Sequence, residues 1–208
     1  MAKLESILYF IDRLLSVGGF PDYPHALNGL QVEAPEDVYR IAVAVDASEA
    51  TIQAAVGLGA QLLVVHHGLF WDGLGPLRGP RFRKVKALIG GKTGLYAAHL
   101  PLDAHPEIGN CALLTREMGL EPSGPFGSFD GQAIGWWAQG PVERKELEAR
   151  MVAAVSGEVR LVPGGPERVE KVGVVTGGGA SFLGEAATVG IDTLVTGEAA
   201  HHHFHEAM

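Results

Sequence analysis

Adjacent histidines at the end of an apolar run are the clearest chemical signal in this sequence. His66 and His67 follow the run at residues 62–65 and precede Gly68. Neutral imidazole is a good ligand for first-row divalent metals. Neighbouring side chains in a strand point to opposite faces, so both rings reach one cavity only if the chain turns at Gly68. The alternative is one buried and one solvated histidine.

Further carboxylates and imidazoles follow other apolar runs. Asp46 ends one run, and His99, Asp103 and His105 come after a later one. The carboxyl ends of parallel strands commonly form the binding site of α/β proteins. Asp103 could bridge two metal ions or cap a turn, and Asp46 could serve the site or the N-terminus of the next helix. His99 could be a ligand or a core histidine with one backbone hydrogen bond.

The last third of the chain adds two weaker signals. On a helix, His201 and His205 would share one face, as would His202 and Glu206, and either pair could bind metal or be solvated. The run of glycines at 177–179 could bind a phosphate through backbone N–H groups. It lacks the Lys-Ser/Thr ending of a P-loop, and close packing of a helix on a strand explains it equally well.

Hydrophobic periodicity predicts an α/β fold in which the candidate residues sit at strand ends. The predicted helices cover residues 3–16, 49–58, 81–89, 107–118, 141–155 and 180–189. The predicted strands cover residues 41–46, 62–65, 95–99, 132–138, 158–162, 171–176 and 192–196. The first two strands and their helix form a βαβ unit, so these strands should be parallel neighbours. Residues 20–37 and 72–80 are predicted as loops, and residues 121–131, with two Pro and three Gly, as a domain boundary.

Composition narrows the class of protein. The chain has 208 residues, of which 47% are hydrophobic and 19% charged, as in globular proteins. A net charge of −8 counts against a dedicated nucleic-acid binder, although the basic run at residues 78–86 could meet a phosphate-bearing ligand or be a solvated helix start. No apolar run is long enough to span a membrane. The single cysteine, Cys111, fits a reducing, cytoplasmic location.

Taken in order, these motifs resemble the GTP cyclohydrolase 1 type 2 homolog family, also called the Nif-three-like dinuclear metal proteins. The resemblance covers nearly the whole chain, and its most specific string contains the two histidines. The matching segments are Asn28-Gly-Leu-Gln-Val-Glu33, Ala44-Val-Asp-Ala-Ser48, Leu62-Leu-Val-Val-His-His-Gly-Leu-Phe-Trp71, Ala98-His-Leu-Pro-Leu-Asp-Ala104, Gly109-Asn110, Val175-Thr-Gly-Gly-Gly-Ala180 and Asp192-Thr-Leu-Val-Thr-Gly-Glu198.

The resemblance implies a Nif-three-like fold of two α/β subdomains with largely parallel or mixed sheets flanked by helices. Residues 1–120 would carry the metal ligands, and residues 121–208 would close over the site. The family's ligands correspond to His66, His67 and Asp103, which would hold two divalent ions. Zn, Fe, Mn, Co and Ni all suit such a mixed site. The family's C-terminal Gly-His…Glu segment does not occur among these 208 residues.

The implied activity is metal-dependent hydrolysis of GTP or a related nucleotide, within a toroidal homohexamer. His99 and Glu198 would be the candidates to transfer protons. Two other functions remain open: a non-catalytic metal-binding ring that acts as a scaffold or regulator, and a clamp related to DNA repair. The negative charge counts against the clamp.

Overall fold

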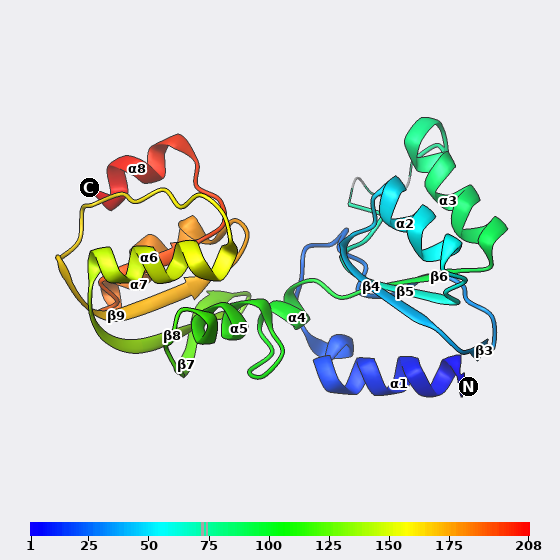
Figure 1. The fold of residues 1–208 in the computed structure, drawn as a ribbon, viewed down its shortest axis with the longest axis horizontal. Helices are drawn as coiled ribbons and strands as arrows, with labels where there is room; N and C mark the ends of the chain where they lie inside the picture. Colours follow the sequence, from blue (N-terminus) through cyan, green and yellow to red (C-terminus); the bar gives the residue numbers. More distant parts are fainter. Residues whose placement is uncertain (72, 74) are drawn as a thin grey trace. The chain divides into compact units, whose positions relative to one another are not determined.

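The computed structural model describes residues 1–71, 73 and 75–208, and the chain divides into two compact units (Figure 1). Asp72 and Leu74, from the loop predicted at 72–80, lie outside the described residues. The units are Met1–Leu102 and Asp103–Met208. The sequence placed the boundary after residue 120, whereas contacts group residues 103–120 with the second unit. The reason lies in Cys111 and Met118, which are buried in the core of that unit.

The first unit is a four-stranded mixed sheet with helices on both faces (Figure 1). Its strand order is β2 (Gly29–Val32), β6 (Gly94–Ala97), β5 (Leu62–His67) and β4 (Ile41–Asp46). Strands β4, β5 and β6 are parallel, which confirms the βαβ prediction, and β2 is antiparallel to β6. A small antiparallel pair, β1 (Ala2–Lys3) and β3 (Asp37–Val38), completes the strands of this unit.

Alternation along the strands decides which helix covers which face. Leu63 and Leu95 point to the face covered by α2 (Glu49–Gly57) and α3 (Gly79–Gly91). Leu62 and Tyr96 pack on the other face with α1 (Leu4–Leu15), which the 3₁₀ helix η1 (Val17–Gly19) follows. Ser48 caps α2 as predicted, since its Oγ accepts a hydrogen bond from the N–H of Thr51 at 3.0 Å.

The second unit is also a four-stranded sheet, but it is mostly antiparallel. Its order is β10 (Thr193–Thr196), β9 (Arg168–Val175), β8 (Gln132–Glu143) and β7 (Pro122–Phe129). Only β9 and β10 are parallel. The helices are α5 (Asn110–Glu117), α6 (Arg144–Val155), η2 (Gly179–Phe182), α7 (Leu183–Thr188) and α8 (His201–Ala207). A short helix, α4 (Leu100–Asp103), spans the division between the units. The α/β class predicted from the sequence is thus confirmed.

Four local predictions were wrong. Strand β2 lies inside the predicted loop 20–37, and β7 occupies the predicted boundary 121–131. Both are edge strands, where glycine and proline are tolerated. Residues 158–162 alternate like a strand but form none and pair with no strand of the sheet. Strand β5 does not end before the histidines but runs through His67, which pairs with Asp46.

Candidate metal centre

Three histidines meet at the carboxyl edge of the first sheet. His66 and His67 end β5, and His99 follows β6. The ring centroids of His66 and His67 are 4.5 Å apart, those of His66 and His99 4.9 Å, and those of His67 and His99 5.7 Å. One ring nitrogen from each residue lies within 4.8 Å of the other two. Such spacing allows a single divalent cation to contact all three side chains after small rotamer changes.

The parallel register of β5 and β6 explains this convergence. The last pair between the two strands is Val65 with Ala97, so the residues that follow emerge together at the same edge. The His66 and His67 rings lie close together there although neighbouring strand residues alternate between faces. The edge of a parallel sheet therefore brings together residues more than thirty positions apart.

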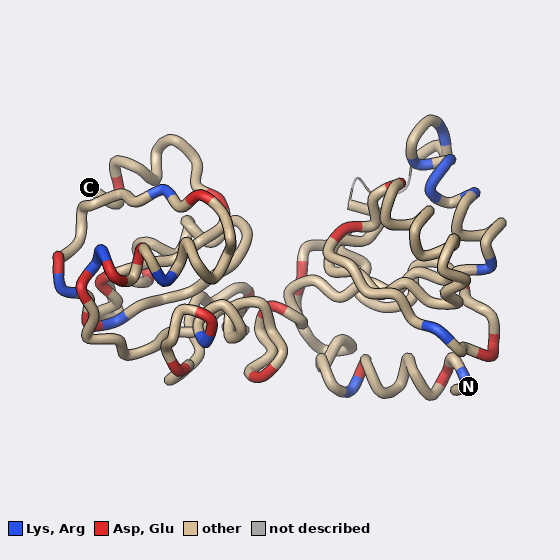
Figure 2. The backbone as a smooth tube through the Cα atoms, viewed as in Figure 1, with Lys and Arg blue, Asp and Glu red and all other residues tan. Residues whose placement is uncertain are grey.

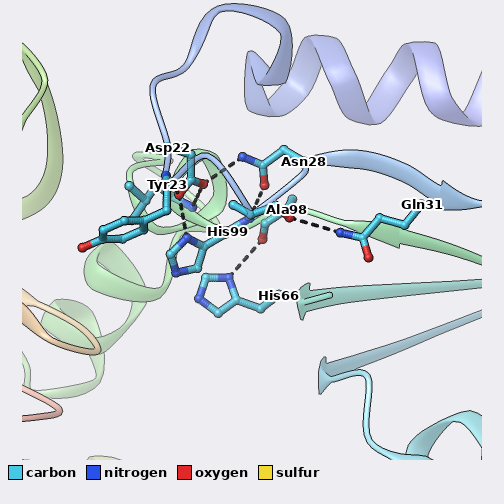
Figure 3. A network of polar contacts seen from close by, with 9 residues as sticks. Asp22, Tyr23, Asn28, Gln31, His66, Ala98 and His99 are labelled. Atoms are coloured by element: carbon cyan, nitrogen blue, oxygen red, sulfur yellow. Dashed lines mark hydrogen bonds and ion pairs between the residues drawn. The ribbon is translucent and has the colours of Figure 1, made fainter. Parts of the chain in front are cut away.

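Each of the three histidines has its Nδ1 held by an oxygen acceptor. The Nδ1 of His66 donates to the carbonyl oxygen of Ala98 at 3.0 Å, and that of His99 to Asp22 Oδ1 at 2.9 Å (Figure 3). The Nδ1 of His67 donates to Asp46 Oδ1 at 2.7 Å. Carbonyl and carboxylate oxygens can only accept, so each neutral ring carries its proton on Nδ1 and its lone pair on Nε2. This is the tautomer that a metal ligand needs, with the outer partner that metal-binding histidines usually have.

Residues 2–208 match the model of one protein family, Duf34/NIF3 (NGG1p interacting factor 3). The chain belongs to this family. The GTP cyclohydrolase 1 type 2 homolog of Deinococcus radiodurans is 42% identical to it, over 98% of this chain and 77% of that protein. The protein of the same name from Archaeoglobus fulgidus is 41% identical, over 99% of this chain and 82% of that protein. The resemblance stated from the motifs is confirmed.

Solved structures agree with this NIF3 assignment. The protein TTHA1606 from Thermus thermophilus superposes with a TM-score of 0.86 and 35% identity, covering 99% of this chain and 81% of that one. Protein ybgI, described as a protein of unknown function, superposes with a TM-score of 0.90 and 37% identity, covering 99% of this chain and 82% of that one. These likenesses show that the chain has the NIF3 fold.

The carboxylate partners of the NIF3 histidines differ in burial. The side chain of Asp22 is 6% exposed and that of His99 13%, whereas Asp46 is 64% exposed and His67 43%. Burial alone would raise the pKa of the Asp22 carboxyl. Hydrogen bonds from His99, Asn28 and the Leu100 N–H outweigh that effect and hold this pKa below its usual value, so Asp22 is an anion at neutral pH.

Two residues of the Asn28-Gly-Leu-Gln31 segment hold the backbone around the histidines. Asn28 Oδ1 accepts from the backbone N–H of His99 at 2.7 Å. Gln31 Oε1 accepts from the N–H of Leu69 at 2.8 Å, just after β5, while its Nε2 donates to the carbonyl of Ala26. The segment read as a loop in the sequence is thus a polar layer that supports the cluster. Only its Asn, Asp and Gln content could have suggested this.

The other predicted site residues belong to the second unit. Asp103 is buried, and its Oδ1 accepts from Asn110 Nδ2 at 2.8 Å and Thr176 Oγ1 at 3.2 Å. Glu198 is exposed, and its N–H donates to the carbonyl of Gly177 at 2.8 Å. The metal-ligand role of Asp103 and the proton-transfer role of Glu198 stay predictions. His99 lies with His66 and His67, which favours the ligand role that the sequence left open for it, and its role in proton transfer stays a prediction.

The remaining sequence signals have ordinary structural uses. His105 Nδ1 accepts from two backbone N–H groups of its own turn, at Glu107 and Ile108. A Cβ at Gly179 would lie 2.5 Å from that of Val175, so this glycine allows close packing. Lys and Arg gather around the start of α3 (Figure 2), where Arg83 Nε is 2.8 Å from Glu49 Oε1.

Among the described residues, no helix is long and apolar enough to cross a membrane.

Proposed function

We propose that this NIF3 family member binds divalent metal ions at His66, His67 and His99 and uses them to hydrolyse a nucleotide-like small molecule. The observation that carries the proposal is that three histidines at one sheet edge each have Nδ1 bound to an oxygen acceptor, with ring nitrogens within 4.8 Å of one another. Three imidazole nitrogens so close together suit a divalent cation better than packing of the rings on one another.

The donor set fits first-row divalent ions such as Zn, Fe, Mn, Co or Ni. When bound, such ions supply Lewis acidity, which activates water and polarises the bond that is attacked. Asp103 is proposed as a further ligand and as the carboxylate that allows a second ion. The Nε2 of His99 can bind a metal or accept a proton, but one lone pair cannot do both at once. Glu198 is proposed as the other proton-transfer group.

GTP is the substrate to test first, because the similar proteins are named GTP cyclohydrolase 1 type 2 homologs. The proposed reaction consumes two waters: the first adds to C8 of guanine and opens the imidazole ring to a formamide, and the second hydrolyses the formamide, releasing formate and leaving the amine. Purified protein loaded with each metal in turn would be incubated with GTP, and formate would be measured. We expect release that falls at least 100-fold in His66→Ala, while His205→Ala, at an exposed histidine, keeps it. Equal turnover in the wild type and His66→Ala would remove the proposal.

Metal analysis with anomalous diffraction from loaded crystals tests the centre itself. The expected result is one peak or more bounded by the three histidines, with Asp103 among the ligands. A metal-loaded ring without turnover on any nucleotide would favour the second candidate, a scaffold or regulator. DNA binding with a steep salt dependence would favour the clamp instead.

We also propose that the chain assembles with copies of itself, as a homohexamer, and that β4 contributes to a contact. β4 is an edge strand with three apolar side chains on one face: Ile41 is 44% exposed, Val43 79% and Val45 61%. A second copy offers the same unpaired backbone and the same apolar stripe, which is the self-complementarity a two-fold contact requires. We expect Val43→Lys to lower the mass measured by sedimentation equilibrium, and Val152→Lys, on the exposed side of α6, to leave it unchanged.

A further inference from the structure

Asp22 is a buried carboxylate that no part of the sequence argument singled out. Its two oxygens accept four hydrogen bonds. Oδ1 accepts from the N–H of Tyr23 at 2.7 Å and from His99 Nδ1 at 2.9 Å. Oδ2 accepts from Asn28 Nδ2 at 2.8 Å and from the N–H of Leu100 at 2.9 Å. With 6% of the side chain exposed, these protein donors take the place of solvent.

The donors on Asp22 are of two kinds. The N–H groups of Tyr23 and Leu100 are backbone donors and cannot become acceptors. Asn28 could turn its amide, but its Oδ1 already accepts from the His99 N–H at 2.7 Å, so turning would replace an acceptor with a donor there. The imidazole of His99 is the one partner that can exchange donor for acceptor, by moving its proton to Nε2.

We propose that Asp22 is the positioning residue of the centre: it holds the His99 proton on Nδ1 and thereby keeps Nε2 available as a ligand or base. The role rests on the proposed function only in what Nε2 then binds. The network in Figure 3 supports this role. Asp22 and Asn28 come from one segment, and Asp22 binds the ring of His99 while Asn28 binds its backbone N–H. Trp71 closes another side of the ring, edge-on with centroids 4.7 Å apart.

The Nδ1 atoms of the other two histidines bind acceptors of other kinds. His66 donates to a backbone carbonyl, which no side-chain substitution removes. His67 donates to Asp46, whose side chain is 64% exposed. If Asp46 is replaced by asparagine, water can form hydrogen bonds with whichever amide atom faces away from His67. Asp46→Asn is therefore a matched control for Asp22→Asn, with the same chemical change at a histidine partner.

An asparagine at position 22 would have one side-chain oxygen, whereas both side-chain oxygens of Asp22 accept hydrogen bonds. If its NH₂ replaced Oδ2, it would face the Asn28 and Leu100 donors, neither of which can adapt. If it replaced Oδ1, the His99 ring could adapt by taking its proton on Nε2 and accepting at Nδ1. The second arrangement strains only the Tyr23 N–H. Asp22→Asn should thus keep the ring in place but turn its lone pair away from the centre.

The experiment is ¹⁵N NMR of the histidine rings in metal-free protein, with His99 assigned by the loss of its signals in His99→Gln. We expect a protonated Nδ1 and an unprotonated Nε2 in the wild type, the reverse in Asp22→Asn, and no change at His67 in Asp46→Asn. A wild-type ring protonated on Nε2, or an Asp22→Asn ring that keeps its proton on Nδ1, would overturn the role. Should Asp22→Asn fail to fold, the wild-type spectrum alone still decides.

Zinc affinity, measured by competition with a chelating dye, gives the second readout. Loss of an outer partner of this kind usually weakens metal binding about 10- to 100-fold. We expect that loss in Asp22→Asn and a change of less than about threefold in Asp46→Asn. A wild type that binds no zinc would remove the proposed function, whereas the ring spectra would still support or overturn the role of Asp22.

Discussion

Two groups of histidines in this chain invite comparison. His66, His67 and His99 lie at a sheet edge, and each Nδ1 is held by an oxygen of the same unit. The second group, on α8, comprises His201, His202, His203 and His205. Its rings also lie close, with centroids 5.4 Å apart for His201 and His205, yet three of the four side chains are exposed. His203 Nδ1 accepts from the N–H of Ala200 and so caps its own helix.

The two groups differ in their outer contacts, not in residue type or closeness of the rings, and we expect these contacts to decide which group binds metal. On α8 a cation would have to order exposed side chains, at a cost of about 0.5–1.5 kcal/mol each. At the sheet edge the tautomer and the ring direction are set before the cation arrives. The sequence favoured neither group by composition, since both are dense in histidine.

The largest expected effect tests this comparison directly. His99→Ala should weaken zinc binding at least 100-fold, because it removes a ligand whose partners stay in place. His205→Ala should change the affinity of the tightest site by less than about twofold. Isothermal titration at one pH would measure both. Equal losses in the two variants would mean that α8 belongs to the centre and that the comparison is wrong.

Much of the fold followed from the sequence because local patterns coincide with tertiary packing. The apolar periodicity of residues 3–16 became α1, and the Ser48 cap became the start of α2. His66 and His67 could be predicted at a strand end because a buried parallel strand leaves an apolar run with polar residues after it. The convergence of His99 with them followed from the parallel register of β5 and β6.

The supporting layer could not be predicted in this way. Asp22 is 77 positions from His99 in the sequence, in a segment without helix or strand periodicity. Its role depends on four donors that only the folded chain brings together. Strand β2 was missed for a related reason: it is four residues long, begins with a glycine, and exists because β6 offers an unpaired edge. Tertiary partners, not local preference, decide both features.

The next effect concerns the contacts that hold the backbone beside the His66, His67 and His99 group. A Cβ at Gly68 would overlap the Gln31 amide, which binds the Leu69 N–H and the Ala26 carbonyl. Gly68→Ala should displace that amide, lower the free energy of unfolding in urea by about 1–2 kcal/mol and weaken zinc binding about tenfold. All three histidines remain, so a loss of affinity would isolate the contribution of their support.

Gly184 provides the matched control in the second unit. It lies within α7, and a Cβ there would meet nothing within 4 Å. Gly184→Ala should leave zinc affinity unchanged and stabilise the protein by up to about 1 kcal/mol, as alanine does in helices. If Gly68→Ala behaved like Gly184→Ala in both measurements, the Gln31 contacts would be irrelevant to the centre.

The last effect concerns Cys111, a residue of metal-binding type whose surroundings prevent that use. Burial raises the pKa of its thiol to about 11, against hydrogen bonds from Thr176 that lower it. A group with a raised pKa in the folded state stabilises the fold below its unfolded pKa, and this contribution is lost as the pH rises through the folded value. Between about pH 9 and 10.5 the wild type should therefore lose about 1.5 kcal/mol of stability relative to Cys111→Ser, which does not titrate. Urea unfolding at both pH values measures this difference, and parallel stability profiles would show that the thiol ionises freely. In that case burial would not be the reason that Cys111 differs from the clustered histidines as a metal ligand. The comparison would then depend on the α8 histidines alone.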